Sequence, residues 1–309
     1  MPPGYKKNPG LSGVMQDSPF FIQEFAMNRL YALITILLAC SVLFACTRQQ
    51  YTQQDAQQDT PQNVQQDIEA VFRYYFTDDK EAIILERFLG QGASVTIPST
   101  IQNLPVVKIG RRAFYGIDRE TRLVNVIIPD TVMIIERDAF SHNRLEELTI
   151  GNSVAFIGRE AFIQNRLTSV NIPDTVYVID SMSFMQNRLV NITIPGSVIF
   201  IGSGAFMQNR LADAVISDGT VYIGRLAFAI NQLTSVNIPD SVTRIWPFAF
   251  ENNPITQISI GANVELGESN LAGHFFPSFD HGFDEFYFAH GRRAGTYTFN
   301  NGAWSVEFR

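Results

Sequence analysis

A 22-residue period runs through the middle of the chain and restricts its fold more than any other feature. Phenylalanine and asparagine return at this interval without insertion or deletion. The phenylalanines are Phe140, Phe162, Phe184, Phe206, Phe228 and Phe250. The asparagines are Asn143, Asn165, Asn187, Asn209, Asn231 and Asn253. A fixed period of this length is typical of a solenoid, in which each repeat forms one turn.

The repeat unit predicts stacked turns with a β-sheet. Its consensus, I-P-D-[ST]-V-x-x-I-G-x-x-A-F-x-x-N-x-L-x-x-V-x, has seven apolar positions, which one turn cannot bury alone. The segment L-x-x-V-x-I ends in alternating apolar residues, which favours a strand, and stacked copies would form a parallel sheet. Glycine after the second isoleucine, as in Gly158, Gly202 and Gly224, predicts a tight bend.

The two recurring side chains have separate expected roles. The phenylalanines should form an internal aromatic stack. The asparagines are polar residues among apolar ones, so we expect each amide to bond backbone groups of its own turn and of the adjacent turn.

This unit resembles the leucine-rich repeat of the BspA-like class, whose core is I-P-x-S-V-x-x-I-G-x-x-A-F. The segment before the repeats also matches, with Val95-Thr96-Ile97-Pro98, Ile109-Gly110 and Ala113-Phe114 in the expected order. The resemblance covers about residues 68–261. It implies a leucine-rich-repeat solenoid that is horseshoe-like, mostly β with loops and short 3₁₀ turns, and capped at both ends. It also implies a secreted or surface protein, in some members an adhesin, and it supplies no catalytic residues.

The N-terminal region has the pattern of a lipoprotein signal. Leu30–Ala45 is almost wholly apolar, follows Arg29, and leads into Leu43-Phe44-Ala45-Cys46, which resembles the bacterial lipobox. We therefore interpret residues 27–46 as a lipoprotein signal peptide and Cys46 as the lipidated residue, with Cys40 as the alternative.

The remaining segments are assigned from composition. Residues 1–26 are expected to lie upstream of the true start, and the glutamine-rich residues 47–66 to form a flexible tether. Residues 67–96 and 262–309 should cap the repeats of residues 97–261, because terminal turns expose apolar edges. The second cap is rich in aromatic residues, and Asn301-Gly302 between two alternating segments predicts a β-hairpin.

Composition and motifs disfavour nucleic-acid binding, metal binding and catalysis. The formal charge is −7 with no visible basic patch, which disfavours nucleic-acid binding. The two cysteines lie in the signal segment, and the four histidines form no metal-ligand pair. The sequence therefore predicts no enzyme activity, no catalytic or metal-binding residues and no cofactor.

Two surfaces are candidates for binding, and the sequence leaves the choice between them open. The first is a stripe of apolar and aromatic side chains between the valine and second isoleucine of successive units, which exceeds what a soluble monomer usually exposes. Its residues are Phe156, Tyr177, Phe200 and Tyr222. The second is the polar strand face, whose residues are Asn125, Glu147, Asn171, Asn191, Thr193, Asp213 and Asn237. A further column contains Arg144, Arg166, Arg188 and Arg210, followed by Gln232. Stacked arginines repel one another, so they need acidic partners or a bound anion, and the alternative, which we favour, is that they extend into solvent.

Together these features predict a non-catalytic, protein-binding lipoprotein at the surface of a bacterium, held to the (outer) membrane through its lipid anchor only. The partner would be an extracellular or host protein, and the specific form an adhesin for host matrix proteins or other cells. One alternative is a periplasm-facing scaffold that self-associates through the stripe. Another is a carbohydrate-binding module, disfavoured because the strand face lacks aromatic platforms.

Overall fold

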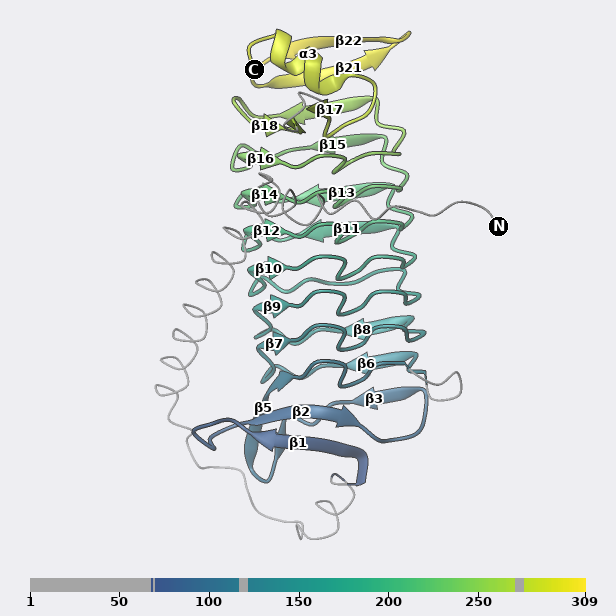
Figure 1. Ribbon diagram of the computed structural model, residues 1–309, viewed down its shortest axis with the longest axis vertical. Helices are drawn as coiled ribbons and strands as arrows, with labels where there is room; N and C mark the ends of the chain where they lie inside the picture. The colour runs from purple at the N-terminus through teal and green to yellow at the C-terminus, as the bar shows by residue number, and fades with distance from the viewer. Residues whose placement is uncertain (1–67, 69, 117–121, 270–274) are drawn as a thin grey trace, which may run out of the picture. The chain divides into compact units, whose positions relative to one another are not determined.

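The computed structural model describes residues 68, 70–116, 122–269 and 275–309. The signal peptide, Cys40, Cys46 and the tether therefore lie outside the described residues. Apart from Ser269, the described residues belong to one compact unit, which comprises residues 60–268 and 275–309. Within this unit the repeats stack turn on turn, and successive turns pair through parallel strands (Figure 1).

The longer sheet has 11 strands and follows the second isoleucine of each unit. Most of its strands are only two residues long, and each pairs with its equivalent in the next turn. In spatial order the strands are β1 (Phe72–Phe76), β2 (Ile83–Phe88), β5 (Leu104–Ile109), β7 (Ile134–Ile135), β9 (Phe156–Ile157), β10 (Val178–Ile179), β12 (Phe200–Ile201), β14 (Tyr222–Ile223), β16 (Arg244–Ile245) and β18 (Glu265–Leu266), with β4 (Thr100–Ile101) beside β5.

The strands predicted from L-x-x-V-x-I lie on another side of the turns. One sheet contains β3 (Ser94–Thr96), β6 (Asn125–Ile127) and β8 (Glu147–Thr149). A second contains β11 (Asn191–Ile194), β13 (Asp213–Ile216), β15 (Ser235–Asn237), β17 (Gln257–Ile260), β21 (Gly295–Asn300) and β22 (Ala303–Phe308). A two-stranded sheet pairs β19 (Glu268–Ser269) with β20 (Phe275–Phe276).

The expectation of one continuous sheet on this side is wrong. The turn with Val170 forms no strand, and the break separates β8 from β11. Leu148 and Val170, on the two turns at the break, are half-buried, whereas the equivalent Val126 and Val236 are buried. The core side chains are less deeply buried on both turns at the break.

A stack of phenylalanine rings fills the centre of the turns, which confirms the predicted aromatic column. Neighbouring ring centroids lie 4.7 to 5.5 Å apart. The stack extends beyond the repeats, through Phe88 and Phe114 at one end and Phe279 at the other. Phe283 then packs edge-on against Phe279, with a ring distance of 5.1 Å, and closes the stack.

The asparagine column is also confirmed, with the same three bonds at each turn. The Oδ1 of Asn187 accepts a hydrogen bond from the Leu167 N–H at 3.1 Å. Its Nδ2 donates to the carbonyls of Phe162 at 2.9 Å and Phe184 at 3.1 Å. The amide thus satisfies three buried backbone groups of two turns and ties these turns together.

The prediction that Gly158, Gly202 and Gly224 form the bends through their conformational freedom is wrong. Gly158, Gly202 and Gly224 lack positive φ angles and instead allow close approach, since a Cβ on Gly202 would lie 2.4 Å from the Asp180 carbonyl carbon. Residues with positive φ turn the chain at two places per unit. They are Arg112, Asp138, Glu160, Met182, Gly204, Leu226 and Phe248, and His142, Gln164, Gln186, Gln208, Ile230 and Asn252. Many of their N–H groups donate to carbonyls of the next turn, as Met182 does to Ser203 at 2.8 Å, which offsets the backbone strain.

Antiparallel pairing ends the parallel stack at both caps. At the N-terminal side β1 pairs antiparallel with β2. At the other side β21 pairs antiparallel with β17 and forms a hairpin with β22 around Asn301 and Gly302, both with positive φ. Helix α3 (Phe283–Ala289) packs its buried face beside this hairpin, as the ring contacts of Phe283 with Tyr297 and Trp304 show (Figure 1).

Candidate functional site

The structure divides the predicted aromatic stripe into two columns. Phe156, Val178, Phe200 and Tyr222 are register partners in adjacent parallel strands. Tyr177 lies one residue earlier, in a neighbouring column in which each residue's N–H donates to the preceding turn. This column contains Met133, Ala155, Tyr177, Ile199, Val221 and Thr243. Tyr177 is thus the first member of its apolar pair, whereas Phe156 and Phe200 are the second members of theirs.

Exposure also differs between the two columns. Tyr177 and Ile199 have exposed fractions of 39% and 38%, and they occupy adjacent turns. Phe156 and Tyr222 are half-buried, and Phe200 is only 9% exposed, which corrects the expectation that it faces solvent. We define the apolar stripe by its accessible members, and these are Phe156, Tyr177, Ile199 and Tyr222.

Trp246 packs at the end of this stripe. Its ring lies 5.7 Å from that of Tyr222 and 6.4 Å from that of Phe200. Arg244 lies over the Trp246 ring at 5.6 Å and forms an ion pair with Glu265. The stripe therefore ends in an aromatic group covered by a paired cation, a feature that the sequence analysis did not identify.

The strand face is exposed as predicted, but it is not continuous. Asn125 is half-buried, and its Nδ2 donates to Glu147 Oε2 at 2.9 Å. The other predicted residues, Glu147, Asn171, Asn191, Thr193, Asp213 and Asn237, are exposed. Two aliphatic side chains, Ile127 at 41% and Val215 at 47%, are also exposed there. The strand break falls at Asn171, so the face comprises two separate sheets.

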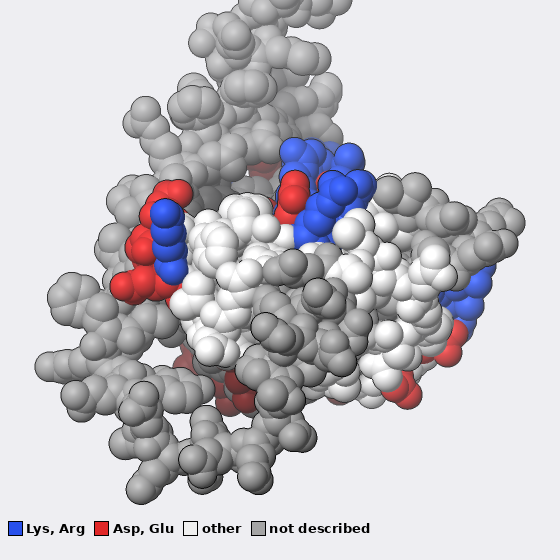
Figure 2. Space-filling view, turned by 90° about the horizontal axis from the view of Figure 1, so that it is seen from below, with Lys and Arg blue, Asp and Glu red and all other residues white. Residues whose placement is uncertain are grey.

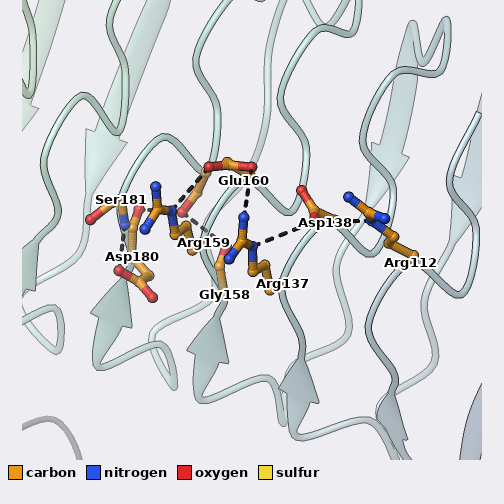
Figure 3. A network of polar contacts seen from close by, with 9 residues as sticks. Arg112, Arg137, Asp138, Gly158, Arg159, Glu160, Asp180 and Ser181 are labelled. Carbon is orange, nitrogen blue, oxygen red and sulfur yellow. Dashed lines mark hydrogen bonds and ion pairs between the residues drawn. The ribbon is translucent and has the colours of Figure 1, made fainter. Parts of the chain in front are cut away.

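A row of alternating charges follows the bends of the first turns and was missed at the sequence level (Figure 3). Asp138, buried at 3% exposure, accepts a hydrogen bond from Arg112 Nε at 3.3 Å and pairs with Arg137 Nε at 3.4 Å. Glu160 pairs with Arg137 at 3.7 Å and with Arg159 at 3.0 Å. Alignment of the turns would have found it, because Arg137-Asp138 and Arg159-Glu160 occupy the same repeat positions. These partly exposed pairs neutralise one another and stabilise the bends modestly.

At the N-terminal end, charge is distributed in small groups. Seen from the β1 end, lysine and arginine side chains lie beside carboxylates at several places, with uncharged surface between them (Figure 2). Lys108, for example, forms an ion pair with Glu136. The described part of the N-terminal end therefore presents no broad field of one sign.

The buried titratable groups have structural partners. Asp284 in α3 is fully buried, and its carboxylate accepts hydrogen bonds from the N–H groups of Ser278 at 2.7 Å and Phe279 at 3.1 Å. Burial raises the pKa of Asp284 to about 7, partly opposed by these two bonds. Burial likewise raises the pKa of Asp180, beside the charge row. Both carboxylates accept hydrogen bonds from backbone N–H groups and stabilise the local backbone conformation.

No metal centre emerges from the described residues. They contain no group of three or more histidine, cysteine, aspartate and glutamate side chains placed to hold a metal ion. His281 stacks on Phe299 at 4.7 Å, and His290 stacks on Phe286 at 4.0 Å. None of the helices in this part of the chain is long and apolar enough to cross a membrane.

The stacked turns, the phenylalanine column and the asparagine column define a leucine-rich-repeat solenoid. Within this class, the family model of the BspA type leucine rich repeat region, with six copies, matches residues 91–165 and 155–273. The chain belongs to the BspA-type leucine-rich-repeat family. Comparison with curated proteins gives no match.

Two solved structures illustrate the likeness. A leucine rich cell surface protein of Faecalibacterium prausnitzii shares 26% sequence identity with a TM-score of 0.54, over 73% of this chain and 63% of that one. The present chain thus spans less than two thirds of that relative. A leucine-rich repeat protein of T. pallidum shares 27% identity with a TM-score of 0.45, over 65% of this chain and 81% of its own.

Proposed function

We propose that the protein is a lipid-anchored, extracytoplasmic protein that binds other proteins without catalysing a reaction, and that it acts as an adhesin for host matrix proteins or other cells. Membership of a repeat family that generally mediates protein binding supports this role, as does the relative described as a cell surface protein. The observation that carries the proposal is the exposed pair Tyr177 and Ile199, which lie on adjacent turns directly before two paired strands of the longer sheet.

The stripe suits a protein partner for a physical reason. Exposed side chains of this kind gain free energy when a partner removes them from water, and aromatic residues at the centre of an interface dominate binding energies. Tyr177 and Ile199 directly precede β10 and β12, and the Ile199 N–H donates to the Tyr177 carbonyl at 3.0 Å. Their backbones are thereby fixed, so little conformational entropy is lost on binding. The polar strand face is interrupted, which makes it the second candidate.

Replacement of Tyr177 and Ile199 together by serine tests this surface. Because both side chains are more than a third exposed, the variant should fold and unfold like the native protein. We expect capture of its partner from matrix and serum proteins to weaken by at least about tenfold. The matched control is Asn171→Ala with Thr193→Ala on the strand face, which should bind normally.

The outcomes separate the alternatives. If the stripe variant binds normally while the strand-face variant loses its partner, the binding surface lies on the strand face. If the stripe variant loses only self-association, the protein is a scaffold that dimerises through the stripe. Protease treatment of intact cells distinguishes the cell surface from a periplasm-facing location.

The anchor is tested at Cys46, which lies outside the described residues. A lipidated cysteine holds a protein to the membrane through its acyl chains. Cys46→Ala should therefore release the protein from the membrane fraction and abolish acyl labelling. Persistence of labelling in Cys46→Ala and its loss in Cys40→Ala would move the lipidation site to Cys40.

A further inference from the structure

A row of arginines follows the edge of the turns just before the strand face. They are Arg144, Arg166, Arg188 and Arg210. The backbone N–H of each donates to the leucine carbonyl 21 residues earlier at 2.9 to 3.0 Å, so the four residues lie in register on successive turns. At the strand spacing the row is about 15 Å long. Gln232 continues the position on the next turn.

Most of this row has no neutralising partner. Arg166 Nη1 lies 3.7 Å from Glu146 Oε1, with both side chains largely exposed. Arg188 and Arg210 are exposed and form no ion pair within the described residues, and the Nε of Arg144 is buried without a hydrogen-bond partner. The bends of the first turns differ, because every arginine drawn there has a carboxylate partner (Figure 3). The backbones of neighbouring arginines are about 5 Å apart, so their unpaired charges repel one another, and an anion bound between them reduces this repulsion.

The same surface residues repeat although nothing in the core requires them. Three successive turns contain Gln-Asn-Arg-Leu, beginning at Gln164, Gln186 and Gln208. The asparagine and leucine are buried, so packing in the core accounts for their repetition, whereas the glutamine and arginine side chains lie outside the core. Gln186 Nε2 donates to Gln208 Oε1 at 2.7 Å, so the amides of two of these turns lie side by side. Other surface positions of these turns vary, for example Ser169, Asn191 and Asp213.

We propose that this row of arginines and glutamines binds a linear acidic polysaccharide. Guanidinium groups bind sulfate and carboxylate groups through paired hydrogen bonds, and a fixed spacing suits a polymer that carries anionic groups on successive sugars. The glutamine amides can bond sugar hydroxyls. This site is separate from the protein-binding stripe.

The flanking residues favour a polysaccharide over nucleic acid. Three residues before Arg166, Arg188 and Arg210, the chain has Ile163, Met185 and Met207. Two residues after these arginines, it has Thr168, Val190 and Ala212. None of these is aromatic, whereas proteins that bind single-stranded nucleic acid stack bases on aromatic side chains. A sugar polymer that is recognised by charge and hydroxyl groups does not need such stacking.

Binding of the full-length protein to immobilised heparin tests the proposal. Arg166→Gln, Arg188→Gln and Arg210→Gln combined should weaken binding by at least about tenfold, because three charge-assisted contacts are lost. The matched control, Arg73→Gln, Arg87→Gln and Arg111→Gln, removes the same charge from exposed residues near the N-terminal cap and should bind like the native protein. Glu146→Gln should strengthen binding, since it frees Arg166.

Two further measurements make the result decisive. The variant with Arg166→Lys, Arg188→Lys and Arg210→Lys keeps the charge and the fold but not the paired hydrogen bonds, so it should bind heparin more weakly than the native protein. Hyaluronan, which carries carboxylates alone, shows whether sulfate is required. The proposal is wrong if native protein binds neither polysaccharide, if both glutamine triple variants bind equally, or if single-stranded DNA binds more tightly than heparin.

Discussion

Replacing Asn187 by alanine is expected to lower the free energy of unfolding by about 4 kcal/mol, because the Leu167 N–H and the carbonyls of Phe162 and Phe184 lose a buried partner. Chemical denaturation monitored by circular dichroism measures the effect. Since each turn contacts only its neighbours, the transition should also broaden as the two halves of the stack uncouple.

The matched control makes the same chemical change on the surface. Asn191→Ala, on the exposed strand face, should change the free energy of unfolding by no more than about 0.5 kcal/mol. Equal effects of the two substitutions would show that the asparagine column does not hold the turns together.

Phe184→Ala should cost about 3–5 kcal/mol, as deletion of a buried aromatic side chain does in well-packed cores. The Phe184 ring is fully buried between those of Phe162 at 5.2 Å and Phe206 at 5.5 Å, and the stacked backbones on both sides limit collapse into the space left. The same denaturation experiment measures the loss. Tyr177→Ala removes an exposed aromatic side chain and serves as the control, and an unchanged midpoint for Phe184→Ala would place the column outside the core.

The sequence predicted the parts of the fold that depend on burial. A side chain such as Phe184 or Asn187 must recur at a fixed interval, because every turn presents the same interior to its neighbours. These columns and the stacking of turns into a solenoid could therefore be predicted from the period, whereas the leucine-rich-repeat class followed from the resemblance of the repeat unit to a known family.

The sequence did not predict how the backbone reaches that interior. The bends use positive φ at residues as different as Met182, Gln186 and Leu226, and bonds between turns supply the compensation, so no residue type marks the positions. The two-residue strands of the longer sheet are too short to show the alternation of apolar and polar residues by which a strand is recognised. The 22-residue period already places Tyr177 one residue out of line with Phe156 and Phe200. It does not show that Phe200 is buried, so the members of the stripe could be predicted only in part.

Photo-cross-linking on intact cells tests the central claim most directly. A photoreactive phenylalanine derivative in place of Tyr177 lies on the apolar stripe, and the same group in place of Asn237 lies on the strand face. The account predicts that position 177 forms a covalent adduct with a second protein and that position 237 does not. An adduct from position 237 alone, or from neither position under conditions in which cells bind matrix proteins through this protein, would contradict it.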